Sequence, residues 1–373
     1  MMMIYYNLLF LQKKSKPLSI KYLKNMKKIS ILFLVLFAVS FVNAQKAKRT
    51  DAYNYLRNGK LDKAKENIEP CITNEATMMD PKTWFYRGNI FLQIHMNTKP
   101  EYKNLDSNAL EIAYDSYKKA LDLDTKQEYK TQIYLNLATI GNQLYNKGIT
   151  LYQNDKYSDA QKLFERVISV NKTFGNIDTL CIYLSGICAQ LTNNYDQAID
   201  YFTQLKNLKY NRSEIYSSLS DIYRLKKDFN SAQVVIKEGL SLYPTSPIIW
   251  YAQGCYYDNM GNINEALNSY KKSIELKPDF FDSYYNIGAL YYNKAASIID
   301  SANKLPFEET KKYEEMKLSA NNNFQEALPY LEKAHEITPQ DLSTLISLKE
   351  IYTRLNITDK LKVINEQIDQ IKK

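Results

Sequence analysis

The sequence predicts an all-α fold, a solenoid of about eight antiparallel helix hairpins. Small and apolar residues recur at intervals of three and four, which keeps them on one face of a helix. The pattern repeats every 34 residues, without slippage, in four stretches that begin at Thr179, Ser213, Pro247 and Phe281. Hydrophobic alternation of period two, the signature of strands, does not compete with this pattern, so essentially no sheet is expected.

Composition and charge exclude two broad classes of protein. The chain is 45% hydrophobic and 24% charged, which is typical of a folded protein and not of a disordered one. The net charge of +8 is confined to the start, because residues 1–44 hold seven lysines and no acidic residue. The remainder has 42 basic and 41 acidic residues, so no nucleic-acid partner is expected.

The start of the chain has the three parts of a secretory signal peptide, predicted at 26–44. A basic start is followed by the apolar run 31–41 and by small residues before a predicted cut after Ala44. A membrane anchor is the alternative, but it needs about 20 apolar residues, and this run is shorter. The protein is therefore expected to be exported, periplasmic or extracellular, with no transmembrane segment in the mature chain. Residues 1–25 precede a complete signal, which indicates that the start site is Met26.

The stretch 247–279 serves as the reference for all the hairpins. Its first helix is predicted to place three residues on one face: Trp250, Gly254 and Tyr257. Its second helix repeats the spacing: Ala266, Tyr270 and Ser273. Gly261 suits a left-handed turn between the helices, and Pro278 suits the end of the second helix.

This hairpin resembles a tetratricopeptide repeat. The family pattern W-x2-L-G-x2-Y, then A-x3-F, then P is matched except that Gln253 replaces the leucine. The resemblance implies a right-handed superhelix of stacked hairpins, a surface for protein partners, and no catalysis. It extends over nearly all of 45–373, in units near 45–78, 81–127, 141–174, 179–212, 213–246, 247–280, 281–341 and 342–373.

Three segments depart from the regular period. Residues 97–106 are predicted to form a loop, and 128–140 to lengthen the following helix towards its start. In the unit 281–341, the insertion 294–323 is predicted to extend both helices into an antiparallel arm; a mobile excursion is the alternative. The last unit, 342–373, is interpreted as a C-terminal cap, because a terminal repeat lacks one neighbour.

The sequence offers no chemistry for catalysis, so the protein is not expected to be an enzyme. It has two histidines, in different repeats, and none of the common phosphate, dinucleotide, zinc-protease or serine-hydrolase motifs. The four cysteines lack metal-ligand spacing and are expected to remain thiols. No cofactor and no metal are therefore expected.

The resemblance also indicates which residues would face a partner. In the family, certain positions of the first helices line a concave groove. In this chain, we chose twelve residues as the candidate groove: Phe85, Asn89, Tyr145, Tyr152, Tyr183, Asp221, Arg224, Tyr251, Asp258, Tyr285, Asn286 and Tyr292. Tyrosines give a large contact area with a polar tip, which suits an extended peptide or an apolar helix. The alternative is that a chain with 32 tyrosines simply uses them between helices.

Two functions follow as hypotheses. The first is a non-catalytic interaction module of the bacterial cell envelope that binds a peptide or protein in the concave groove. The alternative is a structural subunit of an envelope assembly for secretion, motility or the cell surface. Such a subunit would be held through its convex face or the 294–323 arm.

Overall fold

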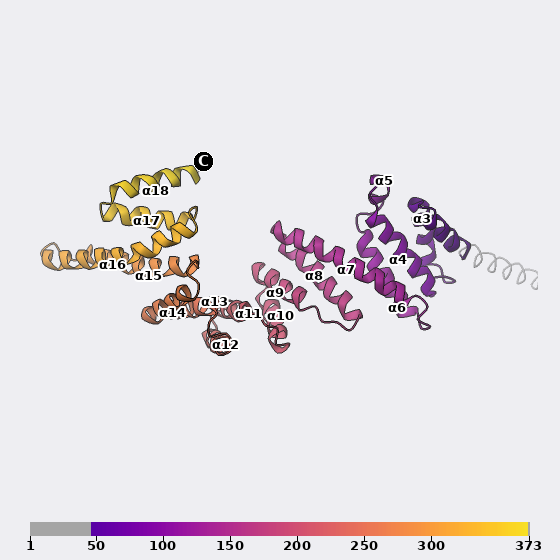
Figure 1. Ribbon diagram of the computed structural model, residues 1–373, viewed down its shortest axis with the longest axis horizontal. Coiled ribbons are helices and arrows are strands. Elements are labelled where there is room, and N and C mark those ends of the chain that lie inside the picture. The colour runs from indigo at the N-terminus through magenta and orange to yellow at the C-terminus, as the bar shows by residue number, and fades with distance from the viewer. Residues whose placement is uncertain (1–45, 372–373) are drawn as a thin grey trace, which may run out of the picture. The chain divides into compact units, whose positions relative to one another are not determined.

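The computed structural model describes residues 46–371, and every regular element in that range is a helix (Figure 1). The expected all-α fold is confirmed. The described chain divides into two compact units. Unit 1 runs to Lys147 and includes Arg166–Ile177; unit 2 holds Gly148–Glu165 and everything from Asp178 onwards. The predicted signal peptide 26–44 and the predicted start-site artefact 1–25 lie outside the described residues.

Unit 1 contains a helix over 46–57 followed by short and long helices that pair in sequence order. They are α3 (Leu61–Ile68), the 3-10 helix η1 (Glu69–Ile72), α4 (Pro81–Met96), α5 (Pro100–Lys103), α6 (Ala109–Leu123) and parts of α7 (Lys130–Gln153) and α8 (Tyr157–Thr173). The main pair is α4 with α6. The segment 97–106, expected to be a loop, contains the single turn α5. Helix α7 starts at Lys130, which confirms that 128–140 lengthens it, and Ile133 and Leu137 are fully buried.

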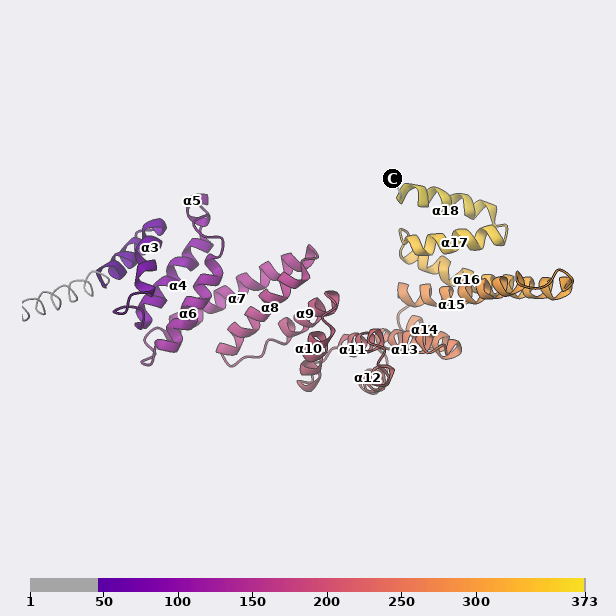
Figure 2. The same cartoon turned by 180° about the vertical axis from the view of Figure 1, so that it is seen from behind.

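Unit 2 is a series of hairpins, each made of two consecutive helices. The pairs are α9 (Thr179–Leu191) with α10 (Tyr195–Asn207), α11 (Glu214–Leu225) with α12 (Phe229–Leu242), α13 (Pro247–Asn259) with α14 (Ile263–Leu276), α15 (Phe281–Ala302) with α16 (Thr310–Ile337), and α17 (Leu342–Arg354) with α18 (Thr358–Ile371). Helices α15 and α16 lie alongside each other in both views (Figures 1 and 2). The insertion 294–323 is helical except around the turn between them.

The hairpins close through a glycine on the first helix and a large residue on the second. A Cβ on Gly254 would collide with the ring of Tyr270, which is fully buried. The same pairing recurs where a Cβ would lie 2.5–2.8 Å from the partner: Gly88 with Tyr117, Gly148 with Phe164, Gly186 with Phe202 and Gly288 with Leu331. Only the absence of a side chain lets the helices approach this closely.

In six hairpins the turn between the two helices has a left-handed residue at the same repeat position; the longer connections α4–α6 and α15–α16 lack it. This position carries Gly59, Asp155, Asn193, Lys227, Gly261 and Asn356, all with positive φ. At Gly261, where φ is +73°, the amide donates to Asp258 O at 2.9 Å, and the next amide donates to Tyr257 O at 2.9 Å. This Schellman arrangement satisfies the last carbonyls of the helix. The sequence predicted it at Gly261 and missed it where the residue is Asp, Asn or Lys.

Lys227→Gly is expected to raise the free energy of unfolding by about 0.5–1 kcal/mol. Lys227 has φ +60°, a conformation that costs a residue with a Cβ about 1–2 kcal/mol, partly offset by the greater freedom of glycine in the unfolded chain. Lys237→Gly is the matched control on the exposed face of α12, where glycine should cost about 1 kcal/mol. Urea denaturation compares the two; equal losses in both variants would contradict the prediction.

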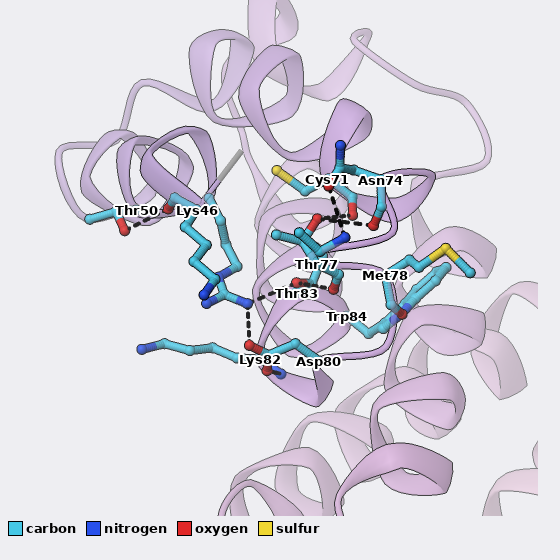
Figure 3. Close-up of polar contacts among 12 residues, drawn as sticks. Lys46, Thr50, Cys71, Asn74, Thr77, Met78, Asp80, Lys82, Thr83 and Trp84 are labelled. Atoms are coloured by element: carbon cyan, nitrogen blue, oxygen red, sulfur yellow. Dashed lines mark hydrogen bonds and ion pairs between the residues drawn. The ribbon is translucent and has the colours of Figure 1, made fainter. Parts of the chain in front are cut away.

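A polar cluster ties the first helix of unit 1 to the loop before α4 (Figure 3). Arg49 donates to Asp80 Oδ2 at 2.5 Å and to Thr83 Oγ1 at 3.1 Å. Thr83 in turn donates to Thr77 O at 2.8 Å, and Thr77 donates to Cys71 O at 2.6 Å. These side chains satisfy backbone carbonyls at the end of η1 and in the loop that follows it, so we assign the cluster a structural role.

Candidate functional site

The twelve predicted groove residues share one property, which is partial burial. None is fully buried, and none is freely exposed. Phe85 and Asn89 lie on α4, Tyr145 and Tyr152 on α7, and the others on α9, α11, α13 and α15 of unit 2. All twelve therefore lie on first helices, at positions between the core and the surface.

Aromatic stacking accounts for several of these side chains. Phe85 stacks on Tyr129, with ring centroids 4.8 Å apart and planes 29° apart. Tyr251 lies between two rings, 5.8 Å from Tyr270 and 5.3 Å from Phe280. The contacts with Tyr129 and Phe280 join one first helix to the residue just before the first helix of the next hairpin. Packing between helices, the alternative to a groove, thus explains part of the aromatic pattern.

The remaining tyrosines of unit 2 each contact another side chain and stay half-buried. Tyr183 lies under the guanidinium of Arg212, which is 4.6 Å from the ring centroid. Tyr292 meets Phe324 edge to face at 5.5 Å, and Tyr152 meets Tyr157 in the same way at 5.4 Å. Tyr285 stacks on Phe281 at 6.0 Å. A half-buried ring that a neighbour holds in place loses little conformational freedom when a partner covers its exposed part.

A tyrosine–asparagine link joins consecutive hairpins at two places. Tyr270 Oη lies 3.4 Å from Asn286 Nδ2, which donates to it, and 3.5 Å from the Cys255 sulfur, to which it donates. In unit 1, Tyr117 Oη donates to Asn89 Oδ1 at 2.7 Å and accepts from Asn136 Nδ2 at 2.8 Å.

Both phenols are buried, which raises the pKa of Tyr270 and of Tyr117, so both remain neutral donors. Asn286 and Asn89 therefore bind the scaffold itself. The signal that could have identified the link is the tyrosine hydroxyl where other repeats carry phenylalanine, as at Phe164 and Phe202.

Unit 2 carries a small charged cluster between α11 and α13, which pack against each other. Arg224 Nη2 lies 3.4 Å from Asp221 Oδ1, and all three side chains of the cluster, Asp221, Arg224 and Asp258, are half-buried. Burial raises the pKa of the Asp221 carboxyl, and the Arg224 charge offsets part of that rise. Burial also raises the pKa of Asp258, against the same arginine. Arg224 Nε is buried without a hydrogen-bond partner among the described residues.

Asp221→Asn is expected to change the free energy of unfolding, relative to the wild type, more favourably at pH 7 than near pH 4. Since the folded-state pKa of Asp221 is raised, its contribution to stability is fully present below the unfolded pKa of about 3.9 and is lost as the pH rises through the folded value. Asparagine has no such dependence. Urea denaturation at both pH values measures the difference. Asp122→Asn, at an exposed side chain of α6, should have the same effect on stability at both pH values. An effect of Asp221→Asn, relative to the wild type, that is equal at the two pH values or more favourable near pH 4 would overturn the assignment.

Two kinds of chemical group bear on catalysis among the described residues: candidate metal ligands and thiols. Between 46 and 371, no group of three or more His, Cys, Asp or Glu side chains could hold a metal ion. The cysteines are buried, and burial raises the pKa of the Cys255 thiol and raises that of Cys188 to about 11. A thiol in that state is a poor nucleophile. Across the same residues, no helix is both long and apolar enough to cross a bilayer.

Comparison with known families bears on two stretches of unit 2. Residues 213–246, which form α11 and α12, match the family model described as tetratricopeptide repeat. Residues 256–294 match a second model, described as TPR repeat, from the end of α13 into α15. These two stretches thus match tetratricopeptide repeats. Proteins with such repeats generally mediate protein–protein interactions, and a pair of antiparallel helices is their structural unit.

Individual relatives are distant. A TPR repeat-containing protein of Methanocaldococcus jannaschii is 23% identical over 287 residues, covering 69% of this chain and 49% of the relative. A tetratricopeptide repeat-containing protein of Caenorhabditis elegans is 27% identical over 164 residues, covering 42% of this chain and 20% of the relative. The chain thus spans about half, or less, of the length of the curated relatives it matches.

Solved TPR structures are also similar. A TPR repeats protein of Bacteroides fragilis is 25% identical, covering 57% of this chain and 98% of the other, with a TM-score of 0.29. A TPR protein of Thermus thermophilus is 19% identical, covering 58% of this chain and 98% of the other, with a TM-score of 0.42.

Proposed function

We propose that this TPR chain is a non-catalytic scaffold of the bacterial cell envelope that holds a peptide or protein partner in the concave groove of its first helices. The observation that carries the proposal is the charged cluster of Asp221, Arg224 and Asp258. Half-burying three charges with one 3.4 Å contact adds little stability, since desolvation offsets the attraction. A cluster that stabilises the fold so poorly is better explained by a partner that completes its hydrogen bonds.

Aromatic side chains on other first helices of unit 2 support the same conclusion. Tyr183, Tyr285 and Tyr292 are half-buried on α9 and α15, each held by another side chain. Tyrosine and arginine are the residue types that most often dominate binding energy at protein interfaces. Half-buried rings and incompletely satisfied charges on the first helices suit a partner with both apolar and polar groups.

Location in the envelope is proposed from the leader. The basic start and apolar run within 26–44 have the organisation of a cleaved signal, and they belong to the part of the chain outside the described residues. The mature protein isolated from envelope fractions should begin at or next to Gln45. A first residue far from that position would overturn this part of the proposal.

Site-specific crosslinking tests the groove. A photo-reactive residue replaces Asn293, an exposed side chain on α15, and crosslinked partners are recovered from intact cells. Asp258→Lys should reduce the crosslink about tenfold or more, because it reverses a charge at the proposed contact. Asp122→Lys makes the same chemical change at an exposed side chain of α6 in unit 1 and should leave the crosslink unchanged. Equal crosslinking in the two variants would contradict groove binding.

A structural subunit held by the arm is the second candidate, favoured by the turn between α15 and α16. Phe307 is 95% exposed there, beside a hollow of about 370 Å³ whose lining includes Leu305, Pro306 and Tyr313. An exposed ring of this kind commonly marks a contact with another protein. Phe307→Ser should release the protein from a large envelope complex while the crosslink at position 293 persists. If Phe307→Ser stays in the complex while Asp258→Lys is released from it, the groove is favoured.

A further inference from the structure

The arm formed by the end of α15 and the start of α16 carries large apolar side chains that its own core does not use. In both views the tip of the arm extends beyond the neighbouring α14 and α17 (Figures 1 and 2). Phe307 at the tip is 95% exposed, and Leu318 on α16 is 63% exposed. The core that joins these helices instead buries Ala295, Ala320 and Phe324. Two large apolar side chains of the arm thus face solvent.

Four exposed residues of the arm follow the spacing of a coiled-coil seam. Phe307 lies in the turn just before α16, and Lys311, Glu314 and Leu318 follow it at steps of four, three and four residues. Such steps place side chains along one narrow stripe of a helix. Phe307 and Glu314 also border the same hollow of about 370 Å³. We call these four residues the arm seam.

The arm seam is complementary to itself when a second copy runs in the opposite direction. If Phe307 of each copy meets Leu318 of the other, then Lys311 of each copy meets Glu314 of the other, because the spacing is the same from both ends. A twofold axis between the arms relates the two sets of contacts, so the interface is isologous. Apolar contacts lie at both ends of it, and two pairs of opposite charge lie between them.

The charge of the arm also favours a second copy over other partners. Residues 304–318 contain four lysines and four glutamates, so two arms have no net charge with which to repel each other. An anionic lipid surface would gain no net attraction from the same stretch. A protein of unrelated sequence would not need Lys311 and Glu314 at equal distances, four residues each, from the two apolar side chains.

The position of the arm seam lets two arms overlap at their tips. The helical part of the seam, from Lys311 to Leu318, is about 10 Å long at a rise of about 1.5 Å per residue. In the antiparallel pair, the remaining hairpins of unit 2 in the two copies lie beyond opposite ends of this overlap. So short a contact buries less area than a standard interface of about 1,600 Å², so we expect weak and reversible association.

We propose that the arm seam joins two copies of this chain in an antiparallel, twofold contact. The proposal goes beyond the proposed function, because the pairing requires no other protein and does not use the charged cluster on α11 and α13. The occupant of the seam is the same seam of a second copy. The expected Kd of the dimer is about 10–100 µM, as suits a small interface.

Sedimentation velocity of the purified mature chain, at concentrations up to about 300 µM, measures the pairing. Lys311→Glu and Glu314→Lys each place like charges opposite one another, so each should raise the Kd about tenfold or more. An equal mixture of the two variants should restore the wild-type Kd to within about threefold. In the mixed dimer, a copy with two glutamates meets a copy with two lysines, and both pairs attract again.

The matched controls lie on the same helix outside the arm seam. Lys333 and Glu336 have the same spacing as Lys311 and Glu314, and their charged atoms are 2.8 Å apart. Lys333→Glu and Glu336→Lys should each sediment like the wild type. Phe307→Ser removes a ring that the fold leaves 95% exposed, so it should weaken pairing about tenfold and leave the circular dichroism spectrum unchanged.

Three results would rule out the proposal: a wild-type chain that is monomeric at about 300 µM, single variants that pair as tightly as the wild type, or a mixture that pairs no better than its components. The crosslink at position 293 tests the groove separately. If the purified wild type is monomeric and Phe307→Ser is still released from the envelope complex, the arm binds a different protein. The seam proposal then fails, and the structural-subunit candidate stands.

Discussion

Tyr270→Ala is expected to lower the free energy of unfolding by about 3–5 kcal/mol, the usual cost of removing a buried aromatic ring. Tyr270 is fully buried. Its ring fills the space over Gly254, and its hydroxyl donates to the Cys255 sulfur and accepts from Asn286. The truncation would therefore leave a cavity and a polar group without its partner. Urea denaturation measures the loss, and hydrogen exchange over 247–280 locates it, since repeat proteins can unfold in steps.

Two variants divide this effect into its parts. Tyr270→Phe keeps the ring and removes the hydroxyl, so it should cost about 1–2 kcal/mol through the bond to Asn286. Phe307→Ala removes an aromatic ring that is 95% exposed and should change stability by less than about 0.5 kcal/mol. A loss below about 1 kcal/mol for Tyr270→Ala would mean that the ring does not hold the hairpin together.

Gly254→Ala is expected to cost about 1–3 kcal/mol, although alanine is the better helix former. The added Cβ would collide with the Tyr270 ring, and a well-packed site can relieve the collision only by shifting a helix or the ring. The preference for alanine over glycine in a helix, about 1 kcal/mol, is too small to compensate fully. Thermal and urea denaturation both report the change.

Gly141→Ala provides the matched control in unit 1. There a Cβ would lie 3.4 Å from Val170, an ordinary contact, so alanine should leave stability unchanged or raise it by up to about 1 kcal/mol. In the Tyr270→Ala background, Gly254→Ala should lose most of its cost, because the ring that it meets is gone. Additive losses in the double variant would falsify the collision.

Much of the fold follows from the repeat. The glycine of most first helices and the spacing of Ala266 and Tyr270 indicated which faces would pack, and these residues are in contact or buried as that spacing requires. Local helical spacing suffices for this, because each hairpin contacts mainly its neighbours.

The candidate site could be predicted only as a set of positions. The repeat frame indicated that Tyr251, Asn286 and Asp258 would lie near one another, but not which of them the scaffold would use. Tyr251 contacts the rings of Tyr270 and Phe280, and Asn286 donates to Tyr270, whereas Asp258 remains a half-buried carboxyl near Arg224. Side-chain partners depend on distances across hairpins, and a single-sequence pattern does not contain those distances.

The sequence by itself determined the all-helical class, the hairpin boundaries of the regular repeats and the close approach at Gly254, because these depend on periodicity and on the absence of a side chain. The tertiary structure decided the left-handed turns at Asp155, Asn193 and Lys227. Asp and Asn adopt this conformation readily, but at Lys227 the packing of two helices overrides the residue's own preference. The tertiary structure also decided the hydrogen-bonded link of Asn89, Tyr117 and Asn136, whose first and last residues come from α4 and α7, more than 30 positions apart in the sequence. Contacts of that range form only when the hairpins stack.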